Sequence, residues 1–258
     1  MDLDPDLAAL RSLGGFFVLR TLPSPPPPPA AAGGGPHRLP TLAEAYEGVA
    51  CDGRRDALTL RVATVGARLR TAEPRVAASL AQQGLAARLW SAALGCAVLY
   101  GRLPGLDPRL LRWDALAAAP DDLWLTGTRA LPGAAANAAA VAAAVLDAHL
   151  EPLGAVLRAR YGVATGLLWG NAGSALAATA RELGRWARVQ DRTDVAERAR
   201  ALTDELFTHP LLRATGARTG TGFRRRSCCL YYRVPGGGLC GDCCLTRLPR
   251  PSPRAASG

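Results

Sequence analysis

The chain has 258 residues, enough for one large hydrophobic core or two modest ones. Its seven cysteines are an odd number, and its first four residues include two aspartates where a secretory leader has basic residues, which argues against a secreted, disulfide-held protein. All basic residues are arginine, isoleucine is absent and methionine occurs once, so the net charge of +10 reflects a compositional bias and is discounted as evidence for nucleic-acid binding.

The first 40 residues divide into an apolar segment and a proline-rich one. Residues 1–22 include an apolar stretch from Leu7 to Leu22, broken at two glycines, which we expect to pack on the body as a helix and a strand. Residues 23–40 contain five consecutive prolines followed by three glycines. Such a segment is first stiff and then flexible, and it cannot bury a core. We therefore expect a linker or insertion there.

A helical body is predicted from residue 41 onward. Thr41 and Glu44 have the spacing of a helix capping box. Residues 57–65 alternate partly and are rich in Leu, Thr and Val, which favours a strand over a helix. Apolar residues then recur at helical spacing over 76–100, with a break expected at Gly84.

The middle of the body contains signals for both helix and strand. Asp107 followed by Pro108 is typical of a helix start. Residues 123–126 are short, apolar and bounded by Asp and Gly, which indicates a strand. The alanine-rich residues 134–157 predict one or two helices that bend near Pro152.

Residues 161–180 are uncharged and long enough to cross a membrane. Their glycines and hydroxyl groups instead favour a buried turn and helix, so no transmembrane segment is expected. Another helix is predicted over 193–207. The fold class is mainly α with a minor β component (α+β). The expected divisions are an N-terminal segment 1–22, a linker or insertion 23–40, a helical body 41–212, a cysteine-rich segment 213–246 and a tail 247–258.

Five of the seven cysteines lie close together near the C-terminus, in the order Cys228, Cys229, Cys240, Cys243 and Cys244. A structural zinc site normally uses two pairs of the form C-x2-4-C, and only Cys240 and Cys243 form one. Neighbouring side chains of an extended segment point to opposite sides, so Cys228 and Cys229 suit a centre with two metal ions better than one tetrahedral ion. Residues 236–238 are glycines that we expect to loop Cys240 back toward Cys228.

Charge around the cysteines also favours an iron–sulfur cluster. An oxidised 2Fe-2S centre with four thiolates carries a charge of about −2. From residue 213 onward the only acid is Asp242, against nine arginines: Arg213, Arg218, Arg224, Arg225, Arg226, Arg233, Arg247, Arg250 and Arg254. Nearby positive charge lowers cysteine pKa values and favours the reduced cluster. The last three of these arginines indicate only a solvated tail.

The pattern Cys-Cys-x10-Cys-x2-Cys behind an Ala/Leu-rich body resembles the FhuF-type ferric-siderophore reductases. A segment with Trp169, Gly170 and Asn171 is similar to the Trp-Gly-Asn segment of that family, and the likeness covers about residues 40–246. It implies a 2Fe-2S cluster on Cys228, Cys229, Cys240 and Cys243, within the segment 213–246, and siderophore binding by the helical body 41–212. Cys244 remains an alternative fourth ligand, and Trp169 and Asn171 either line a pocket or pack.

The resemblance implies a cytoplasmic oxidoreductase that passes one electron from the cluster to a ferric siderophore and releases Fe²⁺ inside the cell. The expected partners are the siderophore and an electron donor such as a ferredoxin, without nucleic acid and with at most peripheral contact to the inner membrane. One alternative is a non-enzymatic zinc-binding module that contacts nucleic acid or protein through its basic C-terminus. Another is a relative that binds a siderophore without reducing it.

Overall fold

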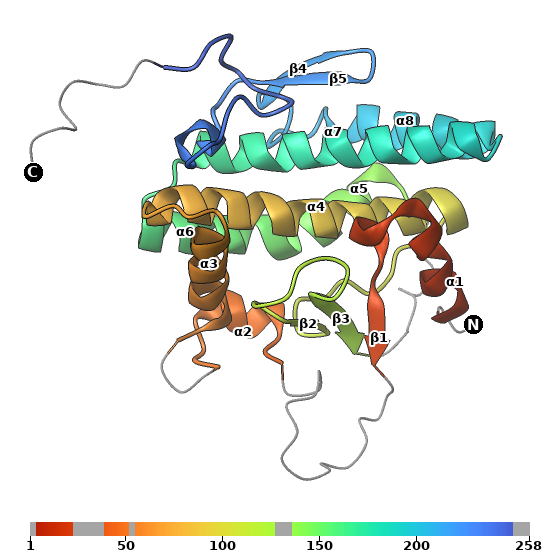
Figure 1. The fold of residues 1–258 in the computed structure, drawn as a ribbon. Helices are drawn as coiled ribbons and strands as arrows, with labels where there is room; N and C mark the ends of the chain where they lie inside the picture. Colours follow the sequence, from red (N-terminus) through yellow and green to blue (C-terminus); the bar gives the residue numbers. More distant parts are fainter. Residues whose placement is uncertain (1–3, 23–38, 52–54, 127–135, 250–258) are drawn as a thin grey trace, which may run out of the picture.

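The computed structural model describes residues 4–22, 39–51, 55–126 and 136–249. Helices dominate and the strands are short, which confirms the predicted α+β class (Figure 1). The α-helices are α1 (Asp4–Ala9), α2 (Leu42–Glu47), α3 (Ala57–Arg68), α4 (Pro74–Tyr100), α5 (Ala138–Ala142), α6 (Glu151–Tyr161), α7 (Thr165–Val189) and α8 (Thr193–Leu206). The strands are β1 (Arg20–Leu22), β2 (Leu111–Trp113), β3 (Leu123–Thr126), β4 (Gly216–Thr219) and β5 (Gly222–Arg225). Short 3₁₀ segments lie at Leu10–Leu13, Gly15–Phe17 and Tyr231–Arg233.

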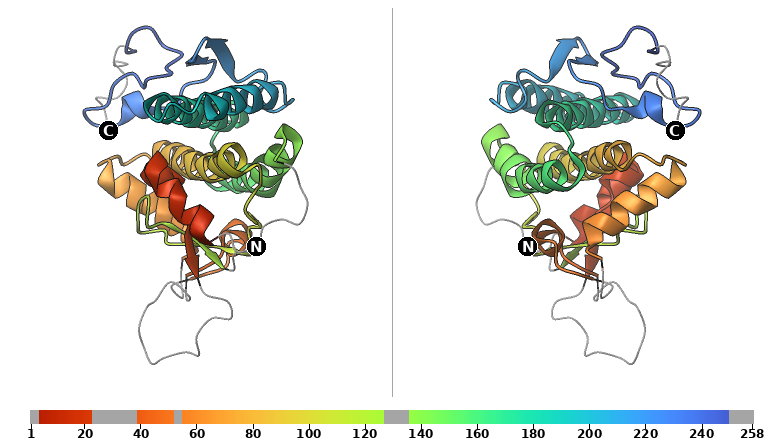
Figure 2. Two further views of the ribbon diagram at one scale, coloured as in Figure 1. Left: turned by 90° about the vertical axis from the view of Figure 1, so that its right-hand side faces the viewer. Right: turned by 90° about the vertical axis from the view of Figure 1, so that its left-hand side faces the viewer.

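The long helices α4 and α7 pack on each other at the centre of the molecule (Figures 1 and 2). The small sheet, α2 and α3 lie on the far side of α4, whereas the β4–β5 hairpin and the C-terminal segment lie on the far side of α7. Because α4 is covered from both sides, it is buried around most of its circumference from Val76 to Val98. The break predicted at Gly84 is wrong: one glycine costs a helix only about 1 kcal/mol, and the packing of α4 outweighs this.

The N-terminal segment packs on the body as predicted from its apolar pattern. Leu10 and Phe17 lie against Gly95 of α4, where a Cβ atom would come within 3.0 Å of each. β1 then pairs in parallel with β3, and β2 pairs with β3 in the antiparallel sense, giving the strand order β1-β3-β2. The strand predicted at 123–126 is therefore confirmed, as is the Thr41–Glu44 capping box.

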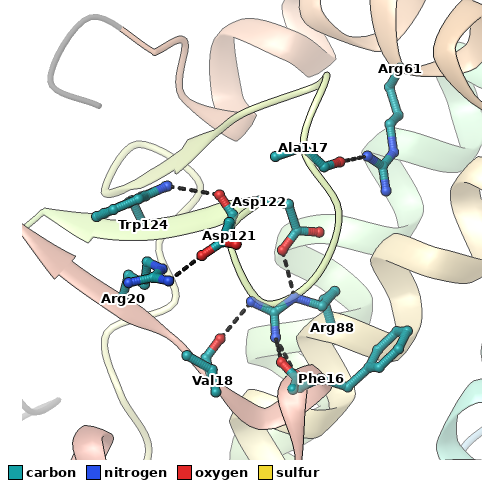
Figure 3. Close-up of polar contacts among 10 residues, drawn as sticks. Phe16, Val18, Arg20, Arg61, Arg88, Ala117, Asp121, Asp122 and Trp124 are labelled. Atoms are coloured by element: carbon teal, nitrogen blue, oxygen red, sulfur yellow. Dashed lines mark hydrogen bonds and ion pairs between the residues drawn. The ribbon is translucent and has the colours of Figure 1, made fainter. Parts of the chain in front are cut away.

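Arg88 of α4 ties that helix to the sheet layer (Figure 3). Its Nε atom donates to Asp122 Oδ1 at 2.8 Å and its Nη2 atom to the Val18 carbonyl at 2.5 Å, while Nη1 donates to the Phe16 carbonyl. The side chains of Arg88 and Asp122 are only 2% and 3% exposed. A charge buried this deeply requires a partner, and every nitrogen of this guanidinium has one.

Two predicted elements are wrong. Residues 57–65 form helix α3 and not a strand, because Asp56 caps it by accepting the Thr59 N–H at 3.0 Å and the buried residues follow helical spacing. No helix starts at Asp107. Its side chain accepts the Arg109 N–H at 2.8 Å within a turn, and the chain continues into β2, whose pairing with β3 overrides the local helix signal.

The alanine-rich stretch is helical from residue 138 to 161, in three parts. Asn137 caps α5, a π-helical segment Ala143–Leu150 follows, and Pro152 lies in the first turn of α6. The irregularity expected near Pro152 is therefore the π-helical segment, which ends two residues before the proline. Within the described residues, Ala138–Tyr161 is the one helical stretch long and apolar enough to cross a membrane, and half of its most apolar window is buried inside the fold.

Residues 161–180 turn at Gly162 and enter α7, as predicted, and α8 confirms the helix expected over 193–207. Most of the predicted linker and most of the predicted tail lie outside the described residues. The domain boundaries themselves stay predictions.

Candidate metal centre

The C-terminal segment lies on the N-terminal half of α7. The antiparallel β4–β5 hairpin leads into it, and the backbone N–H of Arg225 donates to the Asp242 carbonyl at 3.0 Å, which closes the segment into a loop. Gly236 has a φ of 73°, and a Cβ atom at Gly237 would collide with the Tyr231 carbonyl. The glycines thus form the predicted return loop, and they bring Cys240 beside Cys229.

The cysteine thiols lie in two groups. Cys229 and Cys240 are hydrogen-bonded to each other, whereas Cys228 lies within electrostatic range of Cys244 and Cys243. Cys229 is buried and the other four are half-buried. Cys51 is exposed and Cys96 is buried in α4. Neither is among the residues that shift the pKa values of Cys228, Cys229 and Cys240.

Four of the thiols accept a backbone N–H from the residue two positions further on. Leu230 donates to Cys228 at 3.3 Å and Leu245 to Cys243 at 3.4 Å. Tyr231 and Asp242 donate in the same way to Cys229 and Cys240. These four are the predicted ligands. Hydrogen bonds from backbone N–H groups to cysteine sulfur stabilise the thiolate that a metal requires, and they tune iron–sulfur reduction potentials.

The thiols differ in how easily they ionise. The hydrogen bond from Cys240 lowers the pKa of Cys229, with a smaller contribution from the positive charge of Arg225. The same hydrogen bond raises the pKa of Cys240, because Cys240 is the donor of the pair. Burial raises the pKa of Cys228.

The donor set fits a centre with two metal ions better than a single ion. Structural zinc sites gather four ligands around one point, whereas a 2Fe-2S cluster takes two thiolates on each iron. A hydrogen-bonded pair and a separate group of thiols match the second requirement.

A buried polar network connects the thiol segment to both central helices. Ser79 of α4 donates to the Cys229 carbonyl at 2.8 Å. Asn171 of α7 donates to the Ser79 carbonyl at 2.8 Å and accepts from Arg225 Nη2. Asn171, whose role was open from the sequence, thus joins α4, α7 and β5. Trp169 lines a cavity of about 190 Å³ together with Leu211 and residues of α6.

A second set of contacts holds the loop between Cys240 and Cys243. The Asp242 carboxylate accepts from Ser174 Oγ at 2.6 Å and pairs with Arg181 at 3.3 Å, so both its partners come from α7. Neither Ser174 nor Ser79 was identified from the sequence. Phe223 of β5 packs against Phe207 with ring centroids 5.4 Å apart.

Glycines on α7 let this segment approach the helix closely. A Cβ atom at Gly170 would collide with Ser227 Oγ, and one at Gly173 would lie 2.5 Å from Thr215 Oγ1. Ser227 Oγ also donates to the Gly166 carbonyl at 2.7 Å. The three glycines follow helical spacing, so this pattern was the sequence signal for the docking face.

An open groove of about 480 Å³ continues from the thiol segment along the second half of α7. It lies between α7, α8 and the β4–β5 turn, and its charged lining includes Arg181, Arg188, Arg200, Arg218, Glu197 and Asp204. Arg181 belongs both to this groove and to the ion pair with Asp242. One side chain therefore separates the groove from the loop between Cys240 and Cys243.

A helical body that supports paired thiols with backbone hydrogen bonds and a buried guanidinium belongs to the class of proteins that bind a metal cofactor through cysteine. Residues 75–220 match the family described as "Ferric iron reductase FhuF-like transporter", and residues 225–245 match the "FhuF 2Fe-2S C-terminal domain". The first match covers more than half of the chain, so the protein belongs to the FhuF family of ferric iron reductases. The predicted family and the 2Fe-2S cofactor are thereby confirmed. No curated protein matches the chain.

Proposed function

We propose that the protein is a cytoplasmic enzyme that reduces the iron of a ferric siderophore by one electron. Fe³⁺ becomes Fe²⁺, which hard oxygen ligands hold far less tightly. The iron is therefore released without breaking a bond within the chelator. A bound 2Fe-2S cluster supplies electrons one at a time, each replaced from a ferredoxin-like donor. The observation that carries the proposal is the set of four thiols, each with a backbone N–H donor, in a chain of this family.

The proposed ligands are Cys228, Cys229, Cys240 and Cys243. Replacing any of them with serine should reduce the iron and sulfide content and the visible absorption of anaerobically purified protein. Cys244→Ser should keep all three, because Cys244 lies outside the Cys-Cys-x10-Cys-x2-Cys spacing and the Leu245 N–H donates to Cys243 at 3.4 Å. Cys51→Ser is the matched control outside the segment.

The wild-type protein should show an electron paramagnetic resonance signal after reduction with dithionite, and a ferric siderophore should remove it. A colourless protein with one zinc ion per chain would contradict the proposal. Loss of the cluster in Cys244→Ser but not in Cys243→Ser would transfer the fourth ligand position to Cys244.

The groove along α7 is the proposed binding site of the siderophore. Its four arginines outnumber the two acids that line it, Glu197 and Asp204, together with Asp242, which pairs with Arg181, so its net charge favours an anionic chelate. Along a helix each residue advances about 1.5 Å. Arg181 is seven residues beyond Ser174, which bonds the Cys240–Cys243 loop, so an occupant near Arg181 lies about 10 Å along the axis from that contact. This is close enough for an electron to reach the iron without direct contact.

Binding can be tested without electron transfer by replacing Fe³⁺ in an anionic siderophore with Ga³⁺, which is not reduced. The double substitution Arg188→Gln with Arg200→Gln should weaken binding by about tenfold, because two exposed charges together contribute roughly 1 kcal/mol or slightly more. Arg185→Gln, on the same helix but outside the groove lining, is the control. Equal effects of the control and the groove variant would refute this location.

A further inference from the structure

Arg225 is buried without partners for most of its hydrogen-bond donors. It is 2% exposed and lies on β5 between the exposed residues Arg224 and Arg226. Nη2 donates to Asn171 Oδ1 and, at 3.5 Å, to the Leu167 carbonyl. Nε and Nη1 are buried with no partner. Nε carries one N–H bond and Nη1 two, so three of about five donors are free.

This arrangement is unusual within the described part of the chain. Arg20, Arg61 and Arg112 also have an unpartnered Nε atom, but each is only half-buried, and a terminal nitrogen of each has a partner. Arg225 also leaves a terminal nitrogen free. Asp242 does not compensate its charge, because the carboxylate of Asp242 bonds Ser174 and Arg181.

A guanidinium cannot avoid this cost by losing its proton, since its pKa is too high. Burying a charge without a counter-charge costs several kcal/mol. Arg225 lies among the thiols: its backbone N–H donates to the carbonyl of Asp242, between Cys240 and Cys243, at 3.0 Å, and Cys228 follows three positions later in the chain. A 2Fe-2S cluster on four thiolates is a dianion, or about −3 when reduced.

We propose that Arg225 directs its free N–H groups at the iron–sulfur cluster and thereby raises the reduction potential of the cluster. Hydrogen bonds and positive charge stabilise the more negative, reduced state more than the oxidised state. Asn171 fixes the guanidinium by holding Nη2, and Ser79 fixes Asn171. Arg225 is thus a tuning residue, and Asn171 and Ser79 position it. The proposal rests on the cluster of the proposed function but not on the siderophore.

The first test compares reduction potentials, measured by a redox titration of the electron paramagnetic resonance signal. Arg225→Gln should shift the potential to more negative values, and Arg225→Lys should shift it less because the charge is kept. Arg226→Gln is the matched control: it removes the same charge one residue nearer to Cys228, from an exposed side chain. Equal shifts in Arg225→Gln and Arg226→Gln would overturn the proposal, because they would reflect net charge alone.

The second test uses the wild-type protein and therefore does not depend on the folding of a variant. Arginine labelled with ¹⁵N only in its guanidino group should produce a weak ¹⁵N hyperfine coupling to the reduced cluster in pulsed electron paramagnetic resonance. The coupling should disappear in Arg225→Lys and remain in Arg226→Lys. Its absence from the wild-type spectrum would overturn the proposal. Neither test contains a ferric chelate. The tuning role of Arg225 can therefore be refuted while siderophore reduction is retained, and siderophore reduction can be refuted while the tuning role is retained.

Discussion

Arg88 and Arg225 are both 2% exposed, yet their surroundings differ completely. Arg88 has a carboxylate partner in Asp122 and carbonyl partners for its other nitrogens (Figure 3). Arg225 has one amide and one distant carbonyl, and two of its nitrogens have none. The protein alone balances the first charge. On the proposal above, a buried charge that the protein does not balance marks the place where a bound cofactor supplies the missing negative charge.

The largest effect is expected where the balanced charge loses its partner. Asp122→Ala should lower the free energy of unfolding by about 3–5 kcal/mol, because Arg88 remains buried and uncompensated. Asp121→Ala is the control from the neighbouring position: its ion pair with Arg20 is largely exposed, at 56% for Asp121, and should be worth at most about 1 kcal/mol. Urea unfolding followed by circular dichroism measures both.

The same pair can also be removed as a unit. Arg88→Met combined with Asp122→Leu should recover most of the loss, because no buried charge remains. If the double variant were as unstable as Asp122→Ala, the hydrogen bonds of Arg88 to Phe16 and Val18 would be the dominant contribution. The contrast with Arg225 would then concern hydrogen bonding and not charge balance.

His149 sharpens the comparison because a buried histidine, unlike an arginine, can become neutral. Its ring lies 2.9 Å from Tyr46 Oη and 2.7 Å from the Leu106 carbonyl, and burial lowers its pKa to about 4. Between about pH 6.5 and pH 4 the unfolded chain binds a proton at this position and the folded protein does not. The free energy of unfolding should therefore fall with the pH, by about 3 kcal/mol over this window.

The measurement is urea unfolding at a series of pH values. His149→Gln should lose this dependence between pH 6.5 and 4, whereas His209→Gln, in the half-buried segment after α8, should keep it. An unchanged acid dependence in His149→Gln would show that the ring is not held neutral in the folded protein.

A smaller effect is expected from two glycines of α7. Gly170→Ala should lower the free energy of unfolding by about 1–3 kcal/mol and reduce the cluster content, because its Cβ atom would collide with Ser227 Oγ next to Arg225. Gly184→Ala is the same change on the same helix, where the nearest atom, Arg188 Nη1, is 3.7 Å away. It should stabilise the protein by about 0.5–1 kcal/mol through helix propensity. Equal effects would show that the segment does not rest on Gly170.

The sequence predicted the features that depend on local spacing. The cysteine pattern, the glycine return loop, the Thr41 cap and the strand at 123–126 all depend on neighbours in the chain. Helix α3 was missed because its Val and Thr residues suit strands equally well, although Asp56 was a capping signal. The helix expected after Asp107 failed because pairing of β2 with β3 is a long-range interaction.

The supporting residues of the metal centre were harder to predict, because they come from distant segments. Ser79 bonds a carbonyl 150 positions further on, and Ser174 a carboxylate 68 positions further on. No local pattern encodes such contacts. A partial signal did exist: Phe223 and Arg225 occupy alternate positions of one strand and are both buried, so the inward-facing position of an arginine was inferable once that strand was assigned.

The two halves of helix α7 contact different parts of the molecule. Its first half carries Gly170, Asn171 and Ser174, which contact the thiol segment, and its second half carries Arg181 and Arg188, which line the groove. Because these sets share few positions, side chains after residue 181 can change with little effect on the contacts that support the thiol segment. Under the function proposed above, the choice of chelate can therefore evolve while the electron carrier stays fixed.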